Sequence, residues 1–285
     1  MTLKLSKVKL SLAREYLMTK GRDLEKELYK YHFENGSKKS VIYELEKYQG
    51  ENGGFKNLGE GERLSENAMD TNMAFQILHD INASSNEEIV RNGIDYIMNS
   101  YDKDLKYWYP NQKDSPVEYY MITDKWANPC AELIAYLHEY QELVPTHFLA
   151  EVTEQAMKKL PLLNKDGWFA TLCFLRLAER VEDSLREKIV EKVETNIFDI
   201  IETRKEIWSN DYCAKPFWYA PSPRSSLYSL LKEHTIPYLA NEILSQEDEG
   251  NFILNWEADT GEKEWKSIIT MEVLRTLKNY DMISL

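Results

Sequence analysis

Three acidic residues are the candidates for chemistry in this chain. Asp70, Glu132 and Asp211 lie in or next to segments that the sequence predicts to begin helices. Carboxyl groups exchange protons, and two of them held several ångströms apart can cleave a glycosidic bond. Glu257 and Asp259 could also supply one member of such a pair, and the spacing singles out no pair. We therefore treat the first three acids as the candidates for catalysis by proton transfer.

Aromatic side chains are abundant and could hold a ligand, since the chain has 18 Tyr, 9 Phe and 7 Trp. The segment 209–224 combines several rings with three prolines, so we expect a stiff loop there, and its portion 220–224 cannot be a regular helix. Aromatic faces stack on isoprenoids, carbocations or sugars, although the same rings could instead pack the protein's own core. The ligand-binding candidates lie at or next to predicted turns: Trp126, Asn128, Trp168, Tyr212, Trp218 and Trp256.

Similar turns recur at residues 48–56, 164–169 and 245–252. They read Tyr-Gln-Gly-Glu-Asn-Gly-Gly-Phe-Lys, Asn-Lys-Asp-Gly-Trp-Phe and Ser-Gln-Glu-Asp-Glu-Gly-Asn-Phe. In the first and third, a Gln precedes a Phe by six residues, and a Thr downstream opens an apolar helical stretch. Recurrence of one such unit indicates a repeat architecture. It predicts that Phe55, Trp168 and Phe252 are buried at equivalent turns.

Helical periodicity dominates the rest of the sequence, and two types of helix alternate. Some predicted helices are charged and amphipathic, whereas others are apolar on more than one side and should therefore be buried. Asn128-Pro129, Ser37 and Asn86 are start signals for three of them. The predicted helices are 8–18, 22–34, 37–49, 67–81, 86–100, 128–141, 146–161, 168–180, 183–202, 225–232, 234–246 and 264–280.

The Gln-x-x-x-Gly-Gly-Phe and Asp-Gly-Trp turns resemble the repeat motif of the terpenoid cyclase and protein prenyltransferase β-subunit superfamily. The last forty residues are the most similar, and the whole chain resembles bacterial proteins of this size that are labelled prenyltransferase-like. The resemblance implies an all-α fold, an α/α toroid of about six helical hairpins with inner and outer helices, over residues 1–285 as a single domain. It also implies a central pocket whose mouth is formed by the starts of the inner helices, where converging helix dipoles favour an anion.

The catalytic motifs of that superfamily are missing from the chain. Neither the Asp-x-Asp-Asp motif nor the Asp-Asp-x-x-Asp motif of the terpene cyclases occurs. Prenyltransferases bind zinc through an Asp-x-Cys pair and a distant His. Asp211 and Cys213 provide that pair here, but His234 follows much more closely than in the superfamily. We therefore expect no bound metal, and the sequence does not identify a cofactor.

Composition limits the partners. The net charge of −13 and pI near 5.0 disfavour nucleic acid. No stretch approaches the ~20 apolar residues of a transmembrane segment, and the first residues do not form a signal peptide. The three cysteines are far apart in the sequence and predict no disulfide framework. These features favour a cytoplasmic protein.

The leading interpretation is a toroid that binds an apolar or isoprenoid-like small molecule in an aromatic-lined pocket and could transform it. Two alternatives remain open at this point. One is a non-catalytic binding or scaffold toroid, and the other is a carbohydrate-processing enzyme of the (α/α)-barrel type. A fold alone does not decide among them.

Overall fold

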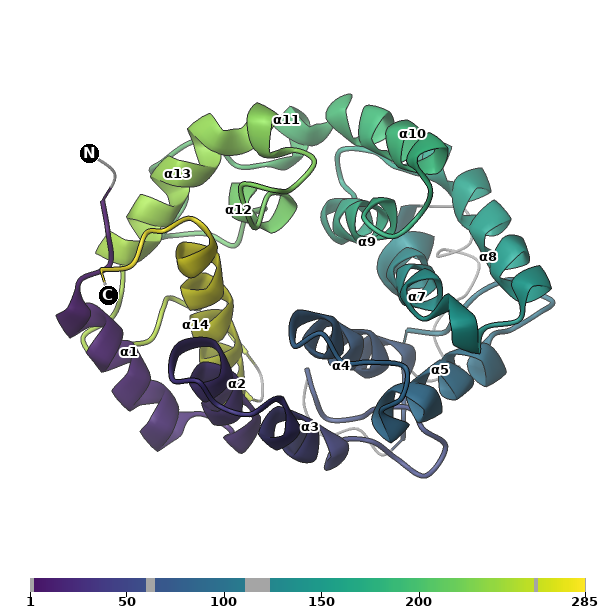
Figure 1. Cartoon of the computed structure of the whole chain (residues 1–285). Helices are drawn as coiled ribbons and strands as arrows, with labels where there is room; N and C mark the ends of the chain where they lie inside the picture. Colours follow the sequence, from purple (N-terminus) through teal and green to yellow (C-terminus); the bar gives the residue numbers. More distant parts are fainter. Residues whose placement is uncertain (1–2, 60–64, 111–123, 259–260, 285) are drawn as a thin grey trace. The chain divides into compact units, whose positions relative to one another are not determined.

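Helices are the regular secondary structure of the described part of the chain. The structure, a computed structural model, describes residues 3–59, 65–110, 124–258 and 261–284 (Figure 1). Within these ranges the backbone forms helices and only isolated β-bridges, without a strand. The all-α prediction is confirmed, whereas the toroidal arrangement stays a prediction. Asp259 lies outside the described residues.

The helices group into two compact units. Residues 45–200 form one, here called the central unit, and residues 1–44 together with 201–285 form the other, the terminal unit. The helix α3 (Lys38–Glu46) runs across the boundary.

The described residues of the central unit contain three helical hairpins (Figure 1). Of their first helices, α7 packs against both α4 and α9, and each of the three is also covered by its own partner, α5, α8 or α10. The apolar helices α7 and α9 bury most of their residues, whereas the charged helices α8 and α10 each bury only two. The predicted alternation of apolar and charged helices is thus confirmed here. The bounds are α4 (Ala68–Asp80), α5 (Glu88–Ser100), α7 (Ala127–Glu139), α8 (Thr146–Lys159), α9 (Trp168–Ala178), α10 (Asp183–Glu194) and the short α11 (Ile197–Ile200).

The terminal unit brings both ends of the described chain together. Its helix α14 packs on α1, α2 and α13, and the short α12 packs on α13. The backbone N–H of Leu5 donates to Met282 O at 2.8 Å, and that of Ser284 donates to Leu5 O at 2.9 Å. The bounds are α1 (Lys7–Lys20), α2 (Asp23–Phe33), α12 (Pro216–Tyr219), α13 (Tyr228–Leu244) and α14 (Glu262–Asn279).

Local start signals explain several helix boundaries. The hydroxyl of Ser37 accepts the N–H of Lys39 at 3.0 Å, just before α3 begins. Asn128 has a non-helical backbone, so the regular part of α7 begins at Pro129, as the sequence predicts. Asn67 caps α4 by accepting the N–H of Asp70 at 2.8 Å.

Two helix predictions were wrong. The helices expected at 225–232 and 234–246 are one continuous helix, α13, which contains Pro237. The loop expected at 209–224 contains one helical turn, α12, with Pro216 as its first residue. Proline fits that position because its missing N–H is one that the first turn of a helix leaves unbonded anyway.

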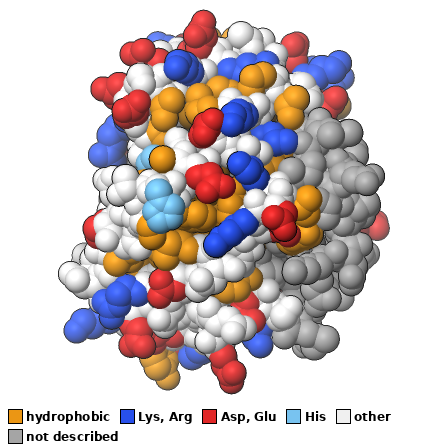
Figure 2. Space-filling view, turned by 90° about the vertical axis from the view of Figure 1, so that its right-hand side faces the viewer, with side chains coloured by type: hydrophobic (Ala, Val, Ile, Leu, Met, Phe, Trp, Pro, Cys, Tyr) orange, Lys and Arg blue, Asp and Glu red, His pale blue; other side chains and the backbone are white. Residues whose placement is uncertain are grey.

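The surface carries charges of both signs. Figure 2 shows Lys and Arg side chains interspersed with Asp and Glu on the face that includes α8, with hydrophobic side chains between them. That face therefore presents no extended field of one sign. In the ranges that the structure covers, we find no helix of sufficient length and apolar character to cross a membrane.

Candidate functional site

The first repeated turn is fixed by its glutamine. Gln49 Nε2 donates to Gly53 O at 2.8 Å, which closes the turn, and to Ile89 O of α5 at 3.0 Å, which attaches the turn to a helix. Phe55 follows, fully buried, and its N–H donates to Thr71 Oγ1 of α4 at 3.0 Å. The turn thereby connects two helices of one hairpin.

The turn near the C-terminus repeats this geometry. Gln246 Nε2 donates to Gly250 O at 2.8 Å and to Lys9 O of α1 at 3.0 Å. Phe252 is fully buried, and its N–H donates to Thr270 Oγ1 of α14 at 3.2 Å. The equivalence of the two turns, predicted from the sequence, is confirmed bond by bond.

Glycine is required at one position in both turns. Gly53 has φ of 88° and Gly250 has φ of 99°, in the left-handed region that L residues with a side chain rarely adopt. A Cβ atom would lie 2.3 Å from Asn92 O in the first turn and 2.2 Å from Leu12 O in the second. The turns therefore approach the neighbouring helix too closely for any side chain.

The turn at 164–169 differs from the other two. Trp168 is only partly buried and is itself the first residue of α9, so its expected burial at an equivalent turn was wrong. The sequence analysis missed another turn that is more similar to the first and third turns. Trp108 is buried, and its N–H lies 3.5 Å from Cys130 Sγ, near the start of α7. Cysteine in place of threonine, with no Gln-to-Gly turn before it, concealed this third turn in the sequence.

The side chain of Asp70 has a structural role. Its buried carboxylate accepts the backbone N–H groups of Asn57 and Gly59, both at 3.0 Å, and Asn67 Nδ2 at 2.7 Å. It therefore fixes the loop that follows Phe55. These three hydrogen bonds engage the carboxylate in a structural role.

Glu132 is the centre of a buried polar cluster between α4, α7 and α9. Its Oε1 accepts the Tyr136 hydroxyl at 2.9 Å, and its Oε2 accepts Asn72 Nδ2 at 2.9 Å and Arg176 Nη1 at 2.6 Å. Cys173 Sγ lies 3.6 Å from the same Oε2. Burial and the neighbouring Glu132 charge raise the pKa of the Cys173 thiol well above its usual value, so it stays protonated.

A second charged group lies at the far end of the same helices. Glu139 of α7 accepts Arg180 Nε at 2.6 Å and lies 2.9 Å from His79 Nδ1. Although burial alone would raise the pKa of Glu139, the His79 hydrogen bond and the Arg180 charge lower it below its usual value. Arg180 also lies over the Tyr136 ring, which separates this group from Glu132.

Three of the ligand-binding candidates come together in the terminal unit. Tyr212 lies 5.2 Å from Trp256 and 6.3 Å from Trp218 between ring centroids, and Trp256 lies 5.4 Å from Trp265. These four residues, here called the aromatic cluster, are all partly or largely exposed. Asp211 is exposed beside Tyr212 in the sequence. The cluster joins the 209–224 segment to the start of α14.

A buried ion pair underlies this cluster. Lys215 Nζ lies 3.0 Å from Glu242 Oε1, and both side chains are almost fully buried. The ammonium group also lies 5.6 Å from the centroid of the Phe217 ring and 6.0 Å from that of Trp218. Glu242 and the aromatic faces together compensate the buried charge of Lys215.

The other candidates lie in the central unit. Trp126, fully buried, donates from Nε1 to Lys106 O at 3.1 Å and packs the core. Asn128 is half-buried, and its Oδ1 lies 3.7 Å from Cys173 Sγ, which connects it to the Glu132 cluster.

The sequence analysis missed Arg176. It is the single charged residue in the apolar stretch from Trp168 to Ala178, and that isolation was the available signal.

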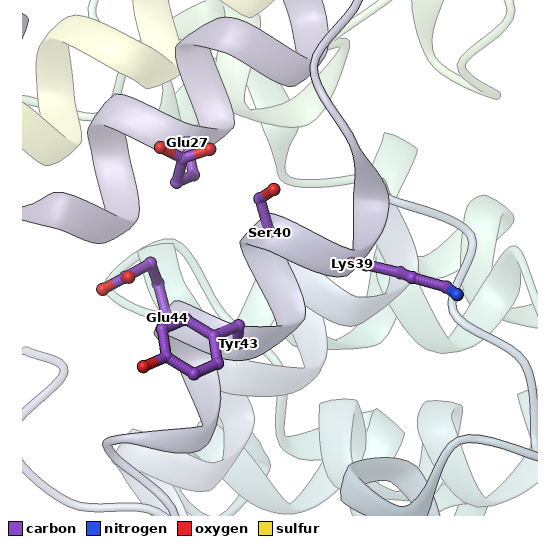
Figure 3. A pocket seen from close by; sticks show the side chains of 5 residues that line it. All are labelled: Glu27, Lys39, Ser40, Tyr43 and Glu44. Atoms are coloured by element: carbon purple, nitrogen blue, oxygen red, sulfur yellow. The ribbon is translucent and has the colours of Figure 1, made fainter.

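An open hollow of the terminal unit contains none of the candidates. Figure 3 shows Glu27 of α2 facing the α3 side chains that line it, Lys39, Ser40, Tyr43 and Glu44. Tyr43 is largely exposed there, and the lining combines two acids with one lysine. The hollow offers neither enclosure nor convergent donors, so we assign it no role.

In the described ranges, no three His, Cys, Asp or Glu side chains are grouped so that they could hold a metal ion. Burial raises the pKa of the Cys213 thiol, which disfavours the thiolate that zinc requires. No family model, curated protein or solved structure matches the chain.

Proposed function

We propose that this protein is an α/α toroid that binds an apolar, isoprenoid-like small molecule at the aromatic cluster. The observation that carries the proposal is the clustering of Tyr212, Trp218, Trp256 and Trp265 with partly exposed rings. Large aromatic groups are normally buried unless a ligand or partner covers them, because each buries a large apolar area.

The toroid is supported by which helix each repeated turn is hydrogen-bonded to. Gln49 binds α5, the helix that follows α4 in the sequence. Gln246 precedes α14, the last helix, and binds α1 at the other end of the chain. In a closed ring, α1 is the next helix after α14, so the two turns would then follow one rule.

Binding is better supported than catalysis. Asp70 is fully engaged in fixing a loop, and Glu132 is engaged by Arg176 and three neutral donors. Asp211, the remaining one of the three candidate acids, is exposed beside Tyr212 of the aromatic cluster. A non-catalytic binding toroid is therefore the second candidate. The carbohydrate-processing alternative lacks a convergent pair of acids among the described residues of either unit.

Titration with three probes tests the proposal. Farnesyl diphosphate, farnesol and a maltooligosaccharide are added while intrinsic tryptophan fluorescence is followed. We expect saturable quenching by both farnesyl compounds that is lost in Trp218→Ala and Trp256→Ala. Tyr43→Ala is the matched control, because Tyr43 is an exposed aromatic residue of the same unit outside the cluster. A response to the sugar alone, or no response to any probe, would refute the isoprenoid proposal.

A further inference from the structure

The ion pair between Glu132 and Arg176 is asymmetric in exposure. Glu132 is buried to 1% exposure of its side chain, whereas the Arg176 side chain retains 34%. Burying a carboxylate costs free energy, and a buried ion pair is weak grounds for added stability. A role in orienting the arginine accounts for the arrangement better.

Arg176 has hydrogen-bonding capacity to spare. Of its five N–H groups, the one on Nη1 that meets Glu132 is the only one with a partner among the described residues. The Glu132 carboxylate accepts hydrogen bonds from Tyr136 and Asn72 as well as from Arg176, and Cys173 Sγ lies near it. The carboxylate therefore holds one side of the guanidinium group and does not enclose it. A fixed, partly exposed guanidinium fork matches the geometry of a carboxylate or phosphate.

A second donor lies at the start of α7. Asn128 comes just before the regular part of that helix, which contains Glu132. Its Oδ1 is directed to Cys173, at 3.7 Å, and its Nδ2 has no partner among the residues that the structure describes. Cys173 thus connects the amide of Asn128 to the cluster that holds Arg176.

An unpartnered buried acceptor belongs to this cluster as well. Asn72 donates its amide to Glu132, and its Oδ1 is buried without a hydrogen-bond partner in the described structure. Buried polar atoms are rarely left unpaired, so a donor such as a water molecule is expected at this atom. An amide oxygen cannot itself donate to an oxyanion, so Asn72 is not one of the residues that would bind the anion.

We propose that Arg176, oriented by Glu132 and assisted by Asn128, forms a binding site for an oxyanion, either a phosphate or a carboxylate group. The site lies between α7 and α9, which pack side by side in the central unit (Figure 1). It rests on contacts within that unit alone and is independent of the aromatic cluster. Arg176 binds the anion, and Glu132 is a positioning residue.

Calorimetric titration with inorganic phosphate, pyrophosphate and succinate, at constant ionic strength, tests the site. Wild-type protein should bind at least one probe saturably at one site per chain, and Arg176→Lys should bind it about tenfold more weakly, because lysine retains the charge but loses the fork. Asn128→Ala should weaken binding by a smaller factor. Preference for the phosphates or for succinate identifies the class of ligand.

The matched control is Arg186→Lys, since Arg186 is an exposed arginine of the same unit that pairs with Asp183. It should bind as wild type does. Should Arg176→Lys not fold, the comparison of Asn128→Ala with wild type decides. Absence of saturable binding by all three probes, or equal binding by wild type and the two site variants, would overturn the proposal.

Discussion

The two glutamines of the repeated turns each donate a pair of hydrogen bonds to backbone carbonyl groups. Gln246→Ala removes the bonds to Gly250 O and Lys9 O. At about 0.5–1.5 kcal/mol per bond, we expect the free energy of unfolding to fall by about 1–3 kcal/mol. Urea unfolding measures this loss, and Gln49→Ala should cost a similar amount. Gln141→Ala, an exposed glutamine, is the control, and a loss no larger than the control's would contradict the role of Gln246.

Glu139 should make the free energy of unfolding depend on pH in the acidic range. Its pKa is lowered in the folded state, from a usual value of 4.5, by His79 and Arg180. A carboxyl whose folded pKa is lowered contributes stability above its unfolded pKa and loses it as the pH falls through the folded pKa. The stability difference between wild type and Glu139→Gln should therefore be largest near neutral pH and shrink below pH 4.5. Chemical unfolding over this range tests it, with Glu191→Gln on the exposed face of α10 as control; a difference that does not change with pH would be inconsistent.

At the scale of elements, the phenylalanine turns should contribute most to stability. Phe55 is fully buried, so Phe55→Ala should lower the free energy of unfolding by about 3–5 kcal/mol. Trp168 is only partly buried, and Trp168→Ala should cost less despite the larger side chain. Equilibrium unfolding of the two variants compares them directly. A smaller loss for Phe55→Ala than for Trp168→Ala would show that the turn is not a core element.

The sequence predicted elements whose signal is local and missed those that depend on packing. Gln49 and Gln246 were identified because turn, glycine and aromatic residues recur at fixed spacing. The turn at Trp108 escaped, since Cys130 replaces the threonine and the bond that defines it spans 22 residues. The split predicted at residue 233 was wrong, because α13 continues through that position and also contains Pro237.

The same contrast between local signals and packing applies to the candidate site. Tyr212, Trp218 and Trp256 could be grouped because two of them share one proline-rich segment. The role of Glu132 could not be inferred, because its partners Asn72 and Arg176 come from helices 60 and 44 residues away. Nor does any pattern in the sequence say that Asp70 is engaged by backbone N–H groups.

At the scale of the whole molecule, we expect that the order of the helical repeats along the chain can be changed without loss of the fold. Gln246 binds α1 as Gln49 binds α5, and Leu5 is hydrogen-bonded to Met282 and Ser284. If α1 is the outer helix that follows α14 in a closed ring, its position at the start of the chain is not required for folding. Moving residues 3–21 behind Ser284 through a short glycine linker should then preserve the fold. The linker can be short because the two ends already lie side by side in the terminal unit.

We expect this permuted chain to retain the helical circular dichroism of the wild type and to unfold cooperatively, with a melting temperature within about 10 °C of it. A chain that lacks residues 3–21 should be clearly less stable, because the backbone carbonyl of Lys9 that accepts Gln246 is lost. Combining the permutation with Gln246→Ala should destabilise it as much as the same substitution destabilises wild type, since the bond to α1 is conserved in both. A permuted chain no more stable than the deleted one would mean that α1 needs its place before α2, and the toroidal order of repeats would be refuted.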